Sequence, residues 1–232
     1  MHPFARRHNA VRQGGSVPET SGLLLDLGWR YDLMVGAIDV VTGGRLRALR
    51  RQALDLAGLQ PGDAVLDVGC GTGTLALEAH ARVGDTGRVV GVDPAPKQIA
   101  RARAKAARRG PQVEFRLGVI EALPFPEGSF DAALSTLMMH HLPDDLKRRG
   151  LAEIARALKP GGRLVVVDAE HPGHPGQPGH VGAGSLGIRE IAGLMEAAGF
   201  SCGEVTQTRL LPFPRFGRVG IVVGRRQPAP AP

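Results

Sequence analysis

Short hydrophobic runs recur along the middle of the chain and predict buried strands. The runs are rich in β-branched residues and are separated by stretches of helical pattern: Ala64–Val68, Val89–Val92, Val113–Leu117, Phe130–Leu134 and Arg163–Val167. Strands that alternate with helices are typical of βαβ units, in which neighbouring strands run parallel. The pattern therefore predicts an α/β domain built on a parallel sheet.

The regions around these runs set the expected domain layout. Residues 1–21 are polar and show no periodicity, which predicts a mobile tail. A single domain is expected over 22–226, followed by a short C-terminal tail at 227–232. Near its start, a helix ending at Gly58 is predicted from an apolar stripe at helical spacing: Leu46, Leu49, Ala53 and Leu56.

The C-terminal part predicts one more helix and a reversed strand. The apolar stripe of 188–198 predicts a helix with Gly199 as its C-terminal cap. Runs near 203–209 and 218–223 lie too close together for a crossover helix, so they are expected to pair antiparallel. Pro160–Gly162 predicts a tight turn into the fifth strand. The expected fold is a doubly wound, seven-stranded, mostly parallel sheet with one antiparallel strand.

A loop rich in proline, glycine and histidine is predicted between the fifth strand and the last helix, at 169–184. Its His171, His174 and His180 raise the question of a metal site. No further ligand signals accompany them, so a flexible lid is the favoured interpretation and no metal is expected.

The composition fits an ordinary globular domain. Hydrophobic residues make up 43% and charged residues 22% of the 232 positions. The formal net charge of +7 is concentrated around 45–51 and 101–109, and aromatic residues, at 4%, are too few for a base-stacking platform. A solvated basic face is therefore preferred over a nucleic-acid footprint.

Cysteine usage and hydropathy predict a cytoplasmic protein. Cys70 and Cys202 cannot build a disulfide framework or a closed four-ligand metal site. No apolar run approaches the roughly 20 residues that span a bilayer, and the N-terminal residues lack the apolar stretch of a secretory signal. No transmembrane segment is expected, and the oligomeric state is left open.

A glycine-rich segment after the first strand is the strongest chemical signal. Gly69, Gly71 and Gly73 let the backbone approach a ligand closely, and a helix beginning near Thr74 offers unpaired N–H groups to an anionic group. Asp93 ends the second strand, 20 residues after Gly73, where a carboxylate can accept hydrogen bonds from both ribose hydroxyls.

The spacing of this segment argues against a dinucleotide. The dinucleotide fingerprint is G-x-G-x-x-G, whereas these glycines follow G-x-G-x-G and position 74 is threonine. Asp67, two residues before the first glycine, suits a donor that carries a cationic amino group and a sulfonium. The segment therefore favours a sulfonium nucleoside over a nicotinamide cofactor.

Five further motifs in a fixed order give the chain a family resemblance: Val90–Asp93, Glu121–Pro126, Ser129–Ala132, His140–Leu142 and Leu158–Leu164. From about Tyr31 to Phe200 the chain resembles the class I S-adenosylmethionine-dependent methyltransferases, in the type 11 branch that contains ubiquinone and menaquinone C-methyltransferases. The resemblance implies a Rossmann-like methyltransferase fold, S-adenosylmethionine as the methyl donor and S-adenosylhomocysteine as the product.

The same resemblance implies which residues contact the donor. The glycine segment would cradle the methionine portion, Asp93 would bind the ribose, and adenine would lie between Gln98 and Val119–Ile120. The implied set is Tyr31, Asp67, Gly69, Cys70, Gly71, Thr72, Gly73, Asp93, Pro94, Gln98, Val119, Ile120, Glu121, Thr136 and Leu137.

Two departures from the family pattern change these expectations. Many relatives have aspartate or asparagine where this chain has Val119, so adenine recognition is expected to rest on the Ile120 backbone and apolar contact. Ala95 stands where a helix-capping serine is common, which would cost about 1 kcal/mol of helix stability.

Candidate catalytic residues follow the fourth and fifth strands. Methyl transfer needs alignment and exclusion of water, and a general base only if the acceptor must lose a proton. His140 and His141 follow the fourth strand and Asp168 ends the fifth, at the sheet edge where ligands bind. Packing or turn-capping roles are the alternatives for these three residues.

The predicted function is C- or O-methylation of a small-molecule acceptor, such as a quinone, a phenol, a lipid or another secondary metabolite, by in-line displacement. A nucleic-acid methyltransferase is disfavoured, since Ser135–Met138 lacks the Asn/Asp-Pro-Pro-aromatic sequence of base-amine enzymes. A nicotinamide oxidoreductase conflicts with the glycine spacing. The short lid leaves open a non-catalytic paralogue that binds S-adenosylmethionine.

Overall fold

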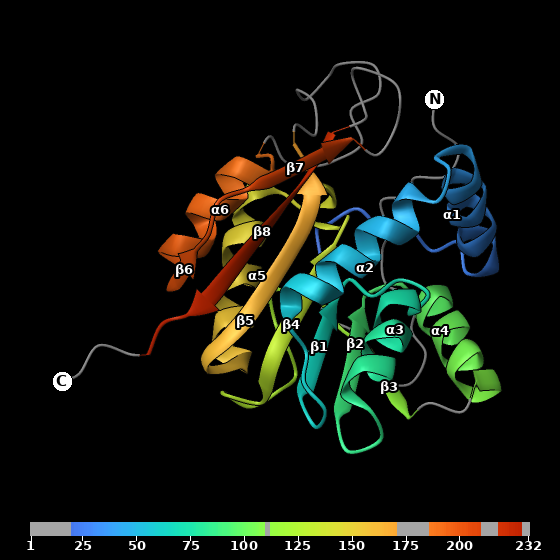
Figure 1. Ribbon diagram of the computed structural model, residues 1–232, viewed down its shortest axis with the longest axis horizontal. Coiled ribbons are helices and arrows are strands. Elements are labelled where there is room, and N and C mark those ends of the chain that lie inside the picture. Colours follow the sequence, from blue (N-terminus) through green and yellow to red (C-terminus); the bar gives the residue numbers. More distant parts are fainter. Residues whose placement is uncertain (1–19, 110–111, 171–185, 210–217, 229–232) are drawn as a thin grey trace.

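A computed structural model describes residues 20–109, 112–170, 186–209 and 218–228 of the chain. A twisted central sheet carries helices on both faces (Figure 1). The helices are α1 Trp29–Val41, α2 Arg45–Ala57, α3 Thr74–Val83, α4 Pro96–Arg109, η1 Met139–His141, α5 Asp144–Ala157 and α6 Ile188–Ala197. No helix in these ranges is long and apolar enough to cross a membrane.

The strands run in the spatial order β3-β2-β1-β4-β5-β8-β6, and β7 also pairs with β8. Their bounds are β1 Ala64–Val68, β2 Arg88–Asp93, β3 Val113–Leu117, β4 Phe130–Thr136, β5 Leu158–Ala169, β6 Phe200–Cys202, β7 Thr206–Arg209 and β8 Arg218–Arg226. Strands β1 to β5 pair in parallel, and β8 is antiparallel to β5, β6 and β7. The predicted doubly wound, mostly parallel sheet is confirmed.

Both faces of the sheet are buried because helices cover each of them. Successive strand residues point to opposite faces. Val65 of β1 packs with α2, α3 and α4, whereas the next residue, Leu66, packs with α5 and α6. The same division is visible in Figure 1, where α2, α3 and α4 lie on one side of the strands. The strands therefore read as nearly continuous hydrophobic runs in the sequence.

Three local expectations need correction. The strand predicted near 203–209 is the shorter β7, and an unpredicted strand, β6, precedes it. Between them, four residue steps from Cys202 to Thr206 face three on β8, which is the register shift of a bulge. The described sheet therefore has eight strands rather than seven. The turn at Pro160–Gly162 lies inside β5 rather than before it, and Leu56 is exposed while Leu54 is buried.

The helix predicted over 188–198 is α6, which ends one residue earlier, and Gly199 follows it with a φ of +90°. Most of the predicted N-terminal tail and nearly all of the predicted lid, including His171, His174 and His180, lie outside the described residues. The domain limits stay predictions.

Candidate active site

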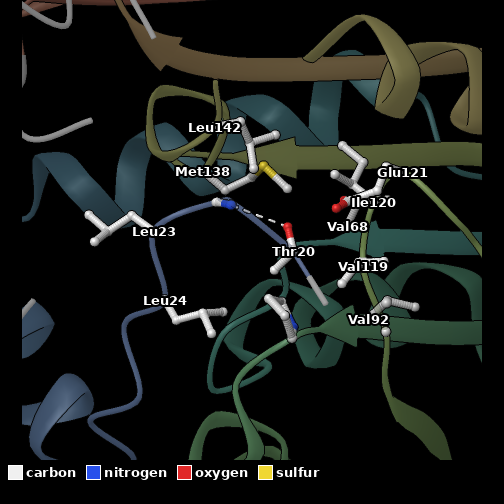
Figure 2. A pocket seen from close by; sticks show the side chains of 14 residues that line it. Thr20, Leu23, Leu24, Val68, Val92, Val119, Ile120, Glu121, Met138 and Leu142 are labelled. Atoms are coloured by element: carbon white, nitrogen blue, oxygen red, sulfur yellow. Dashed lines mark hydrogen bonds between the residues drawn. The ribbon is translucent and has the colours of Figure 1, made fainter. Parts of the chain in front are cut away.

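A hollow lies at the C-terminal ends of β1, β2 and β4, the edge at which ligands bind in open α/β sheets. It has two adjoining parts with about 570 and 350 Å³ of empty space, partly open to solvent. The two parts share six residues: Leu23, Leu24, Gly69, Pro94, Met138 and Leu142. In the smaller part, Met138 and Leu142 lie on one side and Val92 and Val119 on the other (Figure 2).

The glycine loop after β1 is held on β2 and shaped for close approach. The amides of Gly69 and Cys70 both donate to the carbonyl of Val92, at 2.8 and 3.0 Å. Gly69 has a φ of +73°, and a Cβ there would lie 2.7 Å from Cγ of Met138. Gly71, with a φ of +53°, lines the hollow and has no side chain that would keep a ligand away from the loop.

Gly73 serves the packing of the loop rather than the hollow. It precedes α3 with a φ of +74°, and a Cβ there would lie 2.5 Å from Cζ of Phe115 and 2.9 Å from Cβ of Ala102. Only glycine lets α3 start this close to the layer formed by α4 and β3. The G-x-G-x-G spacing therefore has a different physical reason at each glycine.

Asp93 fixes the loop at the end of β2. Its Oδ2 accepts the amide of Gly71 and its Oδ1 the amide of Ala95, both at 2.9 Å. Burial raises the pKa of Asp93 to about 6, although these two backbone hydrogen bonds favour the charged form. The carboxyl lines the larger part of the hollow. A charged acceptor group therefore faces the ligand space at neutral pH.

Asp67 lies behind this loop and does not line the hollow. It is buried, and burial followed by the charge of Asp93 raises its pKa to about 7. Its Oδ2 has no hydrogen-bond partner among the described residues. Two acidic groups thus lie close together below the loop, an arrangement that a nearby cation would stabilise.

The start of α4 is capped from a distant part of the chain. Pro96 begins the helix, a position that suits proline, and the amide of Lys97 donates to Oδ1 of Asp26 at 2.7 Å. Ala95 itself donates to Asp93. The cap expected to be missing at Ala95 is therefore replaced by Asp26 and Asp93.

Each part of the hollow has one buried side-chain oxygen without a partner among the described residues, and the smaller part also has an apolar wall. Val119 and Ile120 are buried and line it together with Glu121. Oε2 of Glu121 and Oε1 of Gln98 are buried, and neither has a partner within the described residues. Gln98 lines the larger part. Buried polar atoms normally have partners, so this wall is incomplete without a ligand or water.

Helix α1 brings Tyr31 to the hollow and is attached through Asp32. Tyr31 lines the larger part, and burial raises the pKa of its hydroxyl. Asp32 accepts hydrogen bonds from Oγ1 of Thr72 at 2.6 Å, Nε of Arg101 at 2.5 Å and Nζ of Lys105 at 3.2 Å. Thr72 therefore faces α1 rather than the hollow.

The two histidines have different environments. Nδ1 of His140 lies 2.7 Å from Oδ1 of Asp168, and its amide donates to Oδ2 at 3.2 Å. Burial would raise the pKa of Asp168, but the charge of His140 and its hydrogen bond outweigh burial and lower it. Burial and the neighbouring His140 lower the pKa of His141 to about 3, and its Nδ1 has no partner among the described residues.

These side chains meet at a strained turn after β4. Leu137 has a φ of +53°, which a non-glycine residue rarely adopts, and its amide donates to the carbonyl of Val167 at 2.7 Å. The ring centroids of His140 and His141 are 3.9 Å apart. His141 lines the hollow beside Thr136 and Leu137, whereas His140 and Asp168 lie behind it.

The predicted site residues fall into two groups. Those that line the hollow are Tyr31, Gly69, Gly71, Asp93, Pro94, Gln98, Val119, Ile120, Glu121, Thr136, Leu137 and His141. Those that support it from behind are Asp67, Cys70, Thr72, Gly73, His140 and Asp168. Burial raises the pKa of the Cys70 thiol well above its ordinary value, which suits a packing role.

Several lining residues were not predicted: Leu23, Leu24, Leu25, Met138 and Leu142. Leu23 reaches the site because its amide donates to the carbonyl of His141 at 2.9 Å. The only sequence signal was an apolar run just after the expected tail, and nothing in that run indicates its partner.

Comparison with known proteins supports the family. Residues 65–162 match the family described as a methyltransferase domain. The chain is 33% identical over 164 residues to the ubiquinone/menaquinone biosynthesis C-methyltransferase UbiE of Teredinibacter turnerae, covering 70% of this chain and 64% of that protein. It is 41% identical over 143 residues to demethylmenaquinone methyltransferase of Thermus thermophilus, covering 62% of each.

The fold is shared with solved methyltransferases. A crystal structure of a SAM-dependent methyltransferase from Aquifex aeolicus has a TM-score of 0.62 at 24% identity, over 76% of this chain and 88% of that one. The chain spans less than two thirds of the length of the two curated relatives. The predicted resemblance to class I methyltransferases of the ubiquinone/menaquinone branch, and the predicted fold, are confirmed.

Proposed function

We propose that this chain, which carries a class I methyltransferase domain, transfers a methyl group from S-adenosylmethionine to a small-molecule acceptor. The observation that carries the proposal is the hollow at the ends of β1 and β2. It combines a glycine loop that a ligand can approach closely, a carboxylate at the end of β2 and buried oxygens that have no partner among the described residues. These groups fit the three chemical parts of the donor.

Each part of the donor has a candidate partner. The glycine segment allows close approach and the start of α3 suits an amino-acid carboxylate, because the amides of Gly69, Cys70 and Gly71 are already bonded within the loop. Asp67 lies behind the loop and supports its position rather than contacting the donor. Asp93 is the acceptor for the ribose hydroxyls. Many relatives have an aspartate or asparagine at the position of Val119, and valine cannot bind the adenine amino group. Glu121 takes this role, because its Oε2 is buried without a partner among the described residues, in the part where adenine is expected.

When bound, S-adenosylmethionine supplies a methyl group on a sulfonium centre, which the acceptor displaces in line. The contribution of the chain is alignment and exclusion of water, and proximity of this kind contributes about 7–11 kcal/mol to catalysis. Leu23, Leu24, Met138 and Leu142 form the apolar cover over the hollow. Tyr31, on α1, closes the side near Gly71.

The pair His140–Asp168 supports an acceptor that must lose a proton. Because Asp168 accepts the hydrogen bond, the proton lies on Nδ1 of His140. His140 does not line the hollow, so its Nε2 can take a proton only from an acceptor that reaches past His141. His141, with its low pKa, stays neutral and serves as a hydrogen-bonding group toward the hollow. A quinol, phenol or related carbon acid is the acceptor class that such a pair serves.

The same reasoning favours a small-molecule acceptor rather than nucleic acid. It also favours a cytoplasmic location. The hollow is lined largely by apolar residues, and the segment after β4 lacks the sequence typical of base-amine methylation. Cys70 and Cys202 are both free thiols, which suits a reducing compartment.

Calorimetric titration with S-adenosylmethionine, and in parallel with reduced nicotinamide cofactor, tests this proposal. Only the first ligand is expected to bind. Incubation with labelled donor and a panel of quinols and phenols then tests transfer. Binding of the nicotinamide cofactor alone would contradict the proposal, and donor binding without transfer to any acceptor would favour the non-catalytic paralogue.

A further inference from the structure

Helix α1 turns both of its acidic residues toward the protein, beside Val35 and Ile38, which pack on the core. Asp32 bonds to Thr72, Arg101 and Lys105, and the buried Asp39 accepts Arg47 through its amide at 2.9 Å and its guanidinium at 2.8 Å. A surface helix normally turns its charges to water and its apolar side chains inward. Here ion pairs and the packing of Val35 and Ile38 attach the helix, and a second apolar face is left outside.

The outward face of α1 is a broad apolar strip. Five of the six exposed large hydrophobic side chains in the described residues lie on this helix: Trp29 at 57%, Leu33 at 63%, Met34 at 41%, Val40 at 79% and Val41 at 73% exposed. Gly36 and Ala37 lie between them and are also exposed. At about 100° per residue, these positions cover roughly 160° of the helix surface.

Cationic side chains lie within and beside this strip, and Arg30 projects from the strip itself at the first turn of α1. The guanidinium of Arg30 lies 5.7 Å from the ring centroid of Trp29, and Arg45, Arg47 and Arg51 are exposed on α2, the element that α1 contacts most. No acidic side chain is exposed on the strip itself within the described helix. In Figure 1, α1 stands at the margin of the molecule beside the start of α2.

We propose that the apolar strip of α1 binds flat to an anionic lipid surface, with the arginines of α1 and α2 at the headgroups. An apolar face with a cationic border is the pattern of a helix that lies in a membrane interface. A second copy of the chain fits less well, since a two-fold contact through this strip would bring the same cationic border against itself.

The placement also suits the hollow. Tyr31 lies on the inner side of the same helix and lines the hollow, and Leu23–Leu25 precede the helix and line it too. A bilayer against the strip would therefore be separated from the hollow only by α1 itself. An apolar acceptor could then enter the hollow from the bilayer. Only this route rests on the proposed function; the lipid-binding surface does not.

Vesicle binding tests the surface, and Trp29 is a built-in reporter because it is the only tryptophan in the chain. The full chain is mixed with vesicles of phosphatidylcholine alone or with added phosphatidylglycerol. We expect sedimentation with the anionic vesicles, a blue shift of Trp29 emission and weaker binding at high salt. L33S combined with V40S should lower the partition coefficient at least about tenfold.

Leu56→Ser is the matched control, because Leu56 is an exposed leucine near the other end of α2. It should bind vesicles like the unmodified chain. Donor affinity by calorimetry should stay unchanged in all three proteins, which shows that they are folded and separates this test from that of the proposed function. Equal vesicle binding by the double variant, or no shift of Trp29 emission, would overturn the proposal. A dimer that the double variant converts to a monomer would instead assign the strip to a second copy.

Discussion

Lowering the pH from 7.5 to 5 is expected to weaken donor binding about tenfold through protonation of Asp93. Its pKa is raised by burial to about 6, so the carboxyl is charged at pH 7.5 and mostly neutral at pH 5. If only the charged form accepts the ribose hydroxyls, affinity is divided by the factor 1 + 10^(pKa − pH). This factor is about 11 at pH 5 and about 1 at pH 7.5. The carboxyl group of the donor keeps its charge over this range, and its amino group only gains charge as the pH falls, so neither change explains weaker binding at pH 5.

Calorimetry at half-unit steps of pH measures this dependence directly. Asp93→Asn should bind the donor weakly at pH 7.5 and show little change down to pH 5, because an amide does not titrate there. Asp67→Asn is the control. Asp67 does not line the hollow, so this variant should keep the drop attributed to Asp93. A dissociation constant that differs less than twofold between pH 7.5 and pH 5 would refute the reasoning. So would an unchanged pH dependence in Asp93→Asn.

The remaining predictions each concern one contact. Asp67→Asn should raise the free energy of unfolding at pH 8 by about 1–3 kcal/mol and leave it unchanged at pH 3. The reason is that the buried carboxylate destabilises the fold only when the pH is above the ordinary pKa of an aspartate. Urea unfolding at the two pH values checks this. Gly69→Ala should abolish donor binding and lower stability by about 1–3 kcal/mol, since its positive φ and the nearby Met138 leave no place for a methyl group; calorimetry and thermal unfolding measure both effects. Asp32→Asn should lower stability by only about 1 kcal/mol, as its ion pairs are partly exposed, yet speed proteolytic cleavage in α1; unchanged cleavage would contradict its anchoring role. His140→Ala should reduce turnover without changing donor affinity, and wild-type turnover would exclude it as the base.

The parts of the site that are local in sequence could be predicted, and the parts that join distant segments could not. The glycine spacing and Asp93 stand at strand ends, where a short pattern determines both conformation and exposure. Asp26 illustrates the other case. It caps α4 from 71 residues away, a contact that no local pattern encodes.

The same distinction explains the errors within the fold. The strand rhythm predicted β1 to β5 because both faces of a parallel sheet are buried and the runs stand out. The bulge between β6 and β7 escaped prediction, since it depends on the register against β8 rather than on composition. Thr72 lies in a ligand-binding motif, yet its hydroxyl turns to Asp32, which only the placement of α1 determines.

The Asp32 contacts make α1 and the glycine loop parts of one thermodynamic unit. Thr72 belongs to the loop, Arg101 and Lys105 to the helix that follows β2, and all three bond to the same carboxylate. Any ligand that favours one arrangement of the loop must favour the matching position of α1. By reciprocity, immobilising α1 on a partner changes donor affinity by the same factor by which the donor changes affinity for that partner.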